Sequence, residues 1–277
     1  MQVLDTIAAL REARARLDGS LGFVPTMGYL HEGHLFLTQR SRRNNDHTWV
    51  SIFVNPTQFG PQEDFERYPR DPERDLALLQ GDGVDIVFMP SAGEVYPSGF
   101  DTYVVPGSIA QRLEGASRPD HFRGVATVVL KLFSIVQPTR AYFGQKDAQQ
   151  VAVVKKMVRD LDLNLEVVAV PTVREPDGLA KSSRNIYLGP GERQAALCLW
   201  RALQAARELR TQGEEQAENV QQAMRAIIVA EPLAQLDYVS IADGETLEEL
   251  RELRPGTLVS IAVRIGKTRL IDNLTLD

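Results

Sequence analysis

The segment Phe23-Val24-Pro25-Thr26-Met27-Gly28-Tyr29-Leu30-His31-Glu32-Gly33-His34 decides the fold. Its apolar start is typical of a buried strand, proline and glycine then form a turn, and a helix is expected to begin at the histidines. A helix start exposes unpaired N–H groups and the positive end of the helix dipole, so it binds phosphate well. Two imidazoles three residues apart lie on one face of the opening turn. Because Gly33 has no side chain, a charged ligand can approach the backbone there. The segment predicts a nucleotide site.

The composition fits a globular protein and argues against some partners. The 277 residues are 43% hydrophobic and 25% charged, with a formal net charge of -6. This balance disfavours a general nucleic-acid-binding surface. We expect no membrane segment, because no run of about 18 apolar residues occurs. Cys198 is the single cysteine, so no intrachain disulfide can form. We expect a cytoplasmic protein.

Strand and helix patterns alternate over the first 170 residues. Strands are expected at 21–24, 49–54, 84–89, 141–143 and 165–170, with helices at 5–17, from the histidines to about 43, and at 72–81, 121–136 and 147–159. This alternation predicts an α/β fold, a doubly wound parallel sheet whose ligands lie beyond the carboxyl ends of its strands. The pattern changes near residue 172. We therefore predict a Rossmann-like domain over 1–172 and a smaller α+β domain over 173–277, with helices near 190–211 and 215–230 and strands near 236–241, 257–264 and 269–272.

Several short patterns have both a functional and an ordinary interpretation. The histidine pair could be two partly buried rings near a turn, and a zinc pair is disfavoured because metalloprotease helices space their histidines at i and i+4. Lys146, after Gly144 and before a helix, could bind phosphate or simply lie in a turn. Gln58 and Gln150 could bind hydroxyls and a carboxylate, or be surface residues.

A hydroxyl- and cation-rich segment follows a glycine-containing turn. It reads Lys181-Ser182-Ser183-Arg184. Two hydroxyls and two cations in four residues suit a polyphosphate, and the alternative is a helix cap with solvated charges.

Longer blocks carry a family resemblance over essentially the whole chain. They are Pro25 to Gly28 with the two histidines, Ser51 to Phe59, Tyr68 to Arg70, Leu113 to Pro119, His121 to Val125, Ser182 to Asn185, and Arg269 to Asn273. Together they resemble the pantoate–β-alanine ligases, within the wider HxGH nucleotidyltransferase superfamily. The resemblance implies AMP-forming condensation of pantoate with β-alanine, through a pantoyl adenylate, with Mg²⁺ and ATP. It also implies a homodimer, formed through the larger domain.

The resemblance implies a role for individual residues. His34 is expected to act as proton donor, with His31 its partner on the phosphates, and with Lys146 and Arg184 as further catalytic residues. Gln58 and Gln150 are expected to hold pantoate. The expected ATP site comprises Met27, Gly28, His31, Gly33, His34, Gly144, Gln145, Lys146, Asp147, Val173, Lys181, Ser182, Ser183 and Arg184. No metal-binding side chain is assigned.

The chain departs from the family pattern at two positions. Gln145 stands where the family usually shows Glu, and Lys181 stands where it often shows an apolar residue. A lid is expected to keep water from the adenylate, with the loop at 60–70 and the smaller domain as candidates. Two rival functions remain open: another nucleotidyltransferase that needs no amine, and a nucleotide-sensing protein without turnover.

Overall fold

The structure is a computed structural model that describes residues 1–61 and 63–277. Gln62, in the loop expected to act as a lid, lies outside the described residues. The chain divides into two compact units, the first Met1–Gly144 with Val153–Pro171 and the second Gln145–Ala152 with Thr172–Asp277. Of the helices in the described parts, none has the length and hydropathy needed to cross a bilayer.

The first unit contains a six-stranded parallel sheet in the order β1-β4-β3-β2-β5-β6. Its strands are β1 (Gln2–Leu4), β2 (Leu21–Thr26), β3 (His47–Ile52), β4 (Ile86–Phe88), β5 (Arg140–Gly144) and β6 (Glu166–Val170). This is the predicted doubly wound α/β sheet. The sequence pattern did not indicate β1, a three-residue edge strand.

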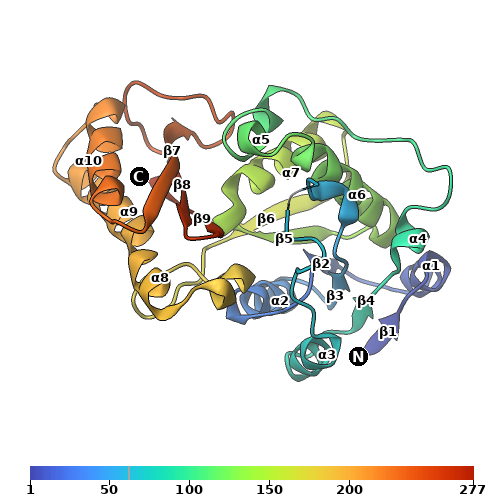
Figure 1. Ribbon diagram of the computed structural model, residues 1–277. Helices are drawn as coiled ribbons and strands as arrows, with labels where there is room; N and C mark the ends of the chain where they lie inside the picture. Colours follow the sequence, from blue (N-terminus) through green and yellow to red (C-terminus); the bar gives the residue numbers. More distant parts are fainter. Residues whose placement is uncertain (62) are drawn as a thin grey trace. The chain divides into compact units, whose positions relative to one another are not determined.

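Helices cover both faces of this sheet. Figure 1 shows α2 and α3 on one face, with α6 and α7 on the other. The helices and turns up to β6 are α1 (Ile7–Ala15), α2 (Glu32–Asn44), η1 (Pro56–Gln58), α3 (Pro72–Gly81), α4 (Ala92–Val95), η2 (Ser108–Ala110), α5 (Glu114–Ser117), α6 (His121–Val136), η3 (Gln145–Asp147) and α7 (Ala148–Asp160). Leu37 of α2 and Leu79 of α3 pack on Val24, Val50 and other buried strand residues. Burying this face stabilises the strand ends from which the candidate loops start.

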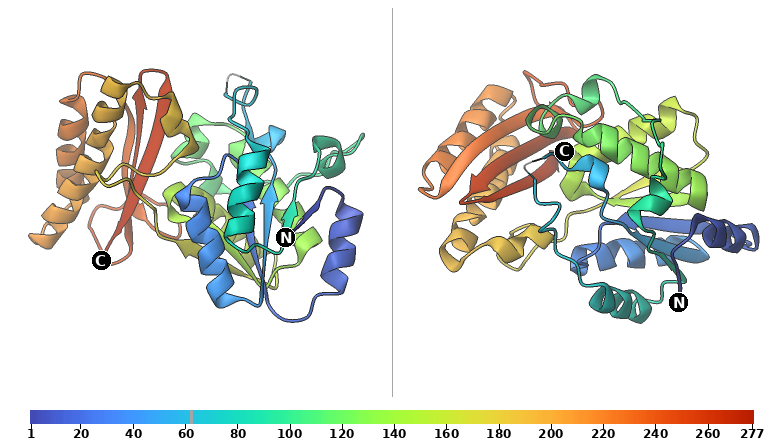
Figure 2. Two further views of the ribbon diagram at one scale, coloured as in Figure 1. Left: turned by 90° about the horizontal axis from the view of Figure 1, so that it is seen from below. Right: turned by 45° about the vertical axis from the view of Figure 1, so that its right-hand side comes forward.

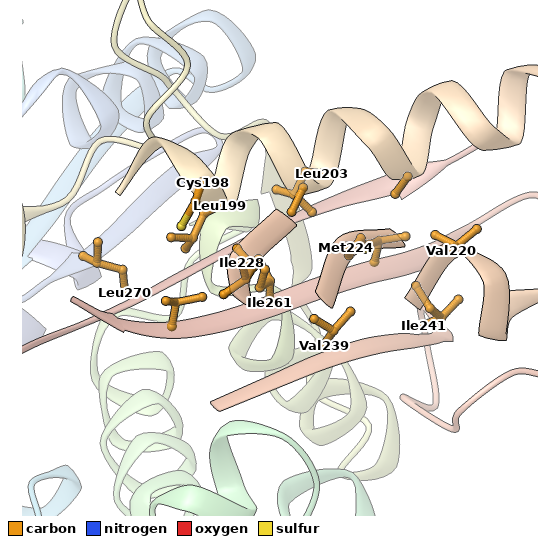
Figure 3. Packing of buried hydrophobic residues seen from close by; sticks show 14 of the residues in the cluster. Cys198, Leu199, Leu203, Val220, Met224, Ile228, Val239, Ile241, Ile261 and Leu270 are labelled. Carbon is orange, nitrogen blue, oxygen red and sulfur yellow. The ribbon is translucent and has the colours of Figure 1, made fainter. Parts of the chain in front are cut away.

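The second unit has a three-stranded antiparallel sheet, β7 (Ala234–Asp243), β8 (Thr257–Ile265) and β9 (Thr268–Leu276). Its own helical elements are η4 (Ser183–Tyr187), α8 (Pro190–Ala195), α9 (Leu197–Thr211) and α10 (Ala217–Val229). Figure 2 shows α9 and α10 side by side against this sheet. In the close view of Figure 3, Leu203 and Met224 lie over Val239 and Ile261, within one buried apolar cluster. Close packing in that cluster keeps the sheet rigid and so holds the ends of the loops attached to it in place.

Candidate active site

The glycine loop after β2 is held by a buried carboxylate. Gly28 has φ +81° and Tyr29 has φ +50°, a conformation that costs energy for a residue with a side chain. The backbone N–H groups of Tyr29 and Leu30 each donate to Asp75 of α3, both at 2.7 Å. Asp75 is 1% exposed, and burial raises its pKa, while the two N–H donors act in the opposite direction. Sequence reasoning missed this residue, because an acid in the first turn of a helix is ordinary at the surface.

The two histidines cap α2 reciprocally. His31 is the N-cap, and its Nδ1 accepts from the Gly33 N–H at 3.1 Å. His34 Nδ1 accepts from the His31 N–H at 3.3 Å, and the ring centroids lie 4.1 Å apart. A nitrogen that accepts carries no proton, so each neutral ring carries its proton on Nε2. The predicted placement of both rings at the helix start is confirmed, and each ring's donor is Nε2–H.

Gln58 lies in η1, which follows β3. It is 9% exposed, its Nε2 donates to Met27 Sδ at 3.1 Å, and its Oε1 accepts from Asn55 Nδ2 at 3.0 Å. Asn55 Nδ2 also donates to the Gly124 carbonyl at 3.2 Å. Because β2 and β3 are parallel neighbours, their carboxyl ends bring Met27 and Gln58 into contact. Because Gln58 is buried, the alternative interpretation of it as a surface residue is wrong.

Residues of α6 hold the main chain at Gln58 in place. A Cβ on Gly124 would come within 2.7 Å of the Gln58 Cα, so only glycine allows this approach. His121 Nδ1–H donates to the Gln58 carbonyl at 2.9 Å, and Arg118 Nη1–H donates to His121 Nε2 at 3.2 Å. Arg118 in turn forms a two-pronged ion pair with Glu63. These contacts hold η1 against α6.

The same environment keeps His121 neutral. Burial, assisted by the charge of Arg118, lowers its pKa from 6.5 to about 4. Since the folded-state pKa is depressed, the associated stability is fully present above pH 6.5 and is lost as pH falls towards 4. The difference corresponds to about 3 kcal/mol.

The Lys146 turn belongs to the second unit. It is η3, directly after β5, and α7 begins at Ala148. The Lys146 side chain is 20% exposed, and its Nζ lies 3.7 Å from Asp147 Oδ1. Gln150 follows in the first turn of α7 and is half-buried. The sequence placed this helix start one residue early, because the 3-10 turn shares the helical pattern.

A short hairpin carries the expected phosphate segment. The Lys181 N–H donates to the Val173 carbonyl at 2.9 Å, and Arg174 pairs with Ala180. Ser182 caps η4 by accepting from the Arg184 N–H at 3.3 Å. Lys181 Nζ lies 2.9 Å from Glu175 Oε1, so its ammonium is paired rather than directed only to solvent.

The predicted residues fall into two groups, one in each unit. The first unit brings together Met27, Gly28, His31, Gly33, His34 and Gln58 at the carboxyl edge of its sheet, where Gly144 ends the neighbouring strand β5. The second unit holds Gln145, Lys146, Asp147, Gln150, Val173 and Lys181 to Arg184. Within residues 1–61 and 63–277, no cluster of three or more His, Cys, Asp or Glu side chains is arranged to hold a metal ion. In the first unit, helix-start donors suit a phosphate and the Gln58 amide suits an organic acid; in the second unit, the lysine turn suits a phosphate.

Comparison with known proteins decides the family. A family model described as pantoate-beta-alanine ligase matches residues 2–275. The chain belongs to the pantoate–β-alanine ligase family. The predicted activity, ATP-dependent condensation of pantoate with β-alanine, is the reaction of pantoate–β-alanine ligases. The predicted resemblance, fold class and enzyme class are thereby confirmed.

Individual ligases of this family match over nearly their whole length. The pantothenate synthetases of Roseiflexus sp. (strain RS-1) and Chloroflexus aurantiacus (strain ATCC 29366) are both 60% identical, covering 100% of this chain and 100% and 99% of theirs. The solved structure of pantothenate synthetase from Thermus thermophilus has a TM-score of 0.95 at 54% identity, with 99% of each chain covered. The Francisella tularensis ligase, complexed with beta-gamma ATP and beta-alanine, has a TM-score of 0.83 at 36% identity, with coverage of 99% and 97%.

Proposed function

We propose that the ligation proceeds in two steps through a pantoyl adenylate. A carboxylate oxygen of pantoate attacks the α-phosphorus of ATP, and the bond to pyrophosphate breaks. The amine of β-alanine then attacks the acyl carbon, AMP leaves, and the amine loses a proton. ATP and β-alanine accompany the Francisella tularensis ligase, which supports both as substrates here. This route needs no protein nucleophile, so positioning and fixed charge supply most of the acceleration.

His34 and His31 act on the phosphates as hydrogen-bond donors. Their reciprocal caps fix both rings with the proton on Nε2, and the N-terminus of α2 adds its positive dipole. The proton-donor role expected for His34 is proposed here as this hydrogen bond from Nε2–H, because a neutral imidazole does not give up its remaining proton. Lys146 and Arg184 add positive charge where negative charge develops during pyrophosphate departure.

The remaining ATP-site residues are assigned by type and position. Glycines allow close backbone approach, and Ser182 and Ser183 offer hydroxyls to phosphate oxygens. The site is proposed to include Met27, Gly28, Gly33, Gly144, Gln145, Asp147, Val173 and Lys181. Gln145 is neutral, so it places no carboxylate against the triphosphate.

Gln58 and Gln150 are proposed to hold pantoate. An amide offers both donors and an acceptor and can bind hydroxyl and carboxylate groups without adding charge. Gln58 is already oriented by Met27 and Asn55, which lowers the entropy cost of binding.

Mg²⁺ is proposed to accompany ATP. Magnesium commonly binds through substrate phosphates, one or two carboxylates and water, and Asp147, beside Lys146, is a suitable carboxylate. When bound, the ion neutralises charge on the phosphoryl oxygens. The phosphates of the nucleotide would supply the other ligands of the ion, because the described residues offer no cluster of three metal-binding side chains.

We further propose a cytoplasmic homodimer formed through the first unit. Tyr103 and Val105 are 39% and 74% exposed in an extended stretch, and neighbouring exposed apolar side chains favour association. The buried, unbridged Cys198 and the need for ATP support a reducing, ATP-rich compartment. Sedimentation of Val105→Glu should show a monomer, whereas an unchanged dimer would place the interface elsewhere.

The reciprocal histidine cap carries this proposal, and an exchange experiment tests it. The protein is incubated with Mg-ATP, pantoate and labelled pyrophosphate, without β-alanine. We expect label to enter ATP only when pantoate is present, and His34→Ala to abolish that exchange. Exchange that requires β-alanine would contradict a separate adenylation step.

A further inference from the structure

The turn that carries Lys146 is held by a residue far along the chain. Asn273 of β9 donates through Nδ2 to the Gln145 carbonyl at 3.0 Å and to the Lys146 carbonyl at 2.8 Å. Both partners belong to the second unit. Asn273 is 4% exposed, so water competes little for these bonds. The main chain on either side of the Lys146 Cα is therefore tied to one side chain.

An amide is the group that this arrangement requires. Two carbonyl oxygens converge on Asn273 Nδ2, and a primary amide nitrogen has two protons to donate. A flipped amide would direct oxygen at two oxygens, so the side-chain orientation is fixed. Asn273 Oδ1 is buried and accepts no hydrogen bond from the residues that the structure describes. An orphaned acceptor is costly, and here the same side chain satisfies two carbonyls of the turn.

Asn273 is itself anchored through its neighbour. Its N–H donates to Asp272 Oδ1 at 2.8 Å. Asp272, 3% exposed, receives two hydrogen bonds from Arg174, at 2.6 and 3.0 Å, and the Arg174 guanidinium stacks 4.0 Å from the Trp200 ring. A buried carboxylate is tolerated when it is paired and hydrogen-bonded in this way. Removing either partner would leave an uncompensated charge.

The Arg174–Asp272 ion pair also fixes the hairpin that leads to residues 181–184, the segment expected to bind phosphate. Arg174 donates to the Gly178 carbonyl at 3.1 Å, across the hairpin turn. Gly178 has φ +97°, and a Cβ there would lie 2.0 Å from Trp200 Cδ1. Val173, next to Arg174, accepts the Lys181 N–H. One buried network thus reaches the main chain of both the Lys146 turn and the segment that begins at Lys181.

We propose that Asn273 and the Arg174–Asp272 pair are positioning residues for adenylate formation. They set the main chain from which Lys146 and the 181–184 segment extend, without touching substrate themselves. The inference rests on the proposed role of Lys146 in binding ATP. Loss of the Asn273 amide therefore slows pantoate-dependent pyrophosphate release through the misplacement of Lys146.

A double-mutant cycle tests this inference in the full-length protein. Asn273→Ala is expected to lower pantoate-dependent pyrophosphate release by about 10- to 100-fold, because small misplacements of a charged group are costly. In a Lys146→Ala background, Asn273→Ala should cost less than about 3-fold, since the group it positions is gone. Thr275→Ala, an exposed position on the same strand, is the matched control and should stay at the wild-type rate.

The outcomes separate this inference from the proposed function. A wild-type rate for Lys146→Ala would overturn the role of Lys146 itself. A slow Lys146→Ala protein with additive loss in the double variant would overturn only the positioning role. If Asn273→Ala does not fold, Asn273→Asp replaces it: its rate relative to wild type should rise as pH falls, because a protonated carboxyl can donate one hydrogen bond. A ratio independent of pH would contradict the inference.

Discussion

Asp75 should control both the stability of the glycine loop and the rate of adenylate formation. In Asp75→Ala, the partly buried N–H group of Tyr29 and the buried N–H group of Leu30 lose their acceptors. A hydrogen bond from a backbone N–H to a carboxylate is worth about 1.5 to 3 kcal/mol, so losing two lowers the free energy of unfolding by about 3 to 6 kcal/mol. Asp75→Asn keeps one acceptor oxygen and should lose about half of that. Tyr29 is also released from its positive φ, which displaces the start of α2.

Two measurements check this expectation. Urea unfolding gives the stability loss, and amide hydrogen exchange should show lost protection at Tyr29 and Leu30. Pyrophosphate release should fall by at least about 10-fold in Asp75→Asn, because the histidine caps follow the loop. Asp71→Asn is the control, since Asp71 caps the same helix and asparagine caps equally well. Asp75→Asn with wild-type stability, exchange and rate would refute the reasoning.

The remaining predictions concern the proposed roles and pH. His34→Ala and Lys146→Ala should each slow adenylate formation by at least about 100-fold, roughly 3 kcal/mol in barrier, in single-turnover pyrophosphate release; near-wild-type release in the folded variants would remove them from the mechanism. Gln58→Ala and Gln150→Ala should mainly raise the KM for pantoate, and a defect confined to ATP affinity would contradict their assignment. His121→Gln should flatten the loss of stability between pH 6.5 and 4 seen in urea unfolding, since the depressed pKa of His121 produces about 3 kcal/mol of it; an unchanged pH profile would count against a neutral, buried ring.

Local pattern was enough to predict the fold, because apolar runs and turn residues specify a parallel sheet without knowledge of distant contacts. It failed at β1, where Gln2–Leu4 is too short and too exposed to show a strand pattern. At the candidate site, the histidine spacing predicted that both rings lie on one face of the opening turn, since a helix start brings residues i and i+3 together, and the structure shows the two rings in contact. The capping itself was not predicted, because histidine is not a usual cap.

The residues that hold the main chain of the candidate site, Asp75 and Asn273, could not be predicted from the sequence for a different reason. Asp75 and Asn273 act on main-chain groups 45 and 127 positions away, and nothing in their local sequence marks them. The resemblance did include Arg269 to Asn273, but it assigned that block no role. Only the folded chain shows that Asn273 reaches the turn at Lys146.

Oxygen labelling of pantoate tests attack at the α-phosphorus most directly. Pantoate with ¹⁸O in its carboxylate is turned over with Mg-ATP and β-alanine, and the masses of AMP and pyrophosphate are measured by mass spectrometry. The adenylate route predicts one labelled oxygen in the phosphate of each AMP and none in pyrophosphate. Unlabelled AMP, or ¹⁸O in pyrophosphate, would contradict it.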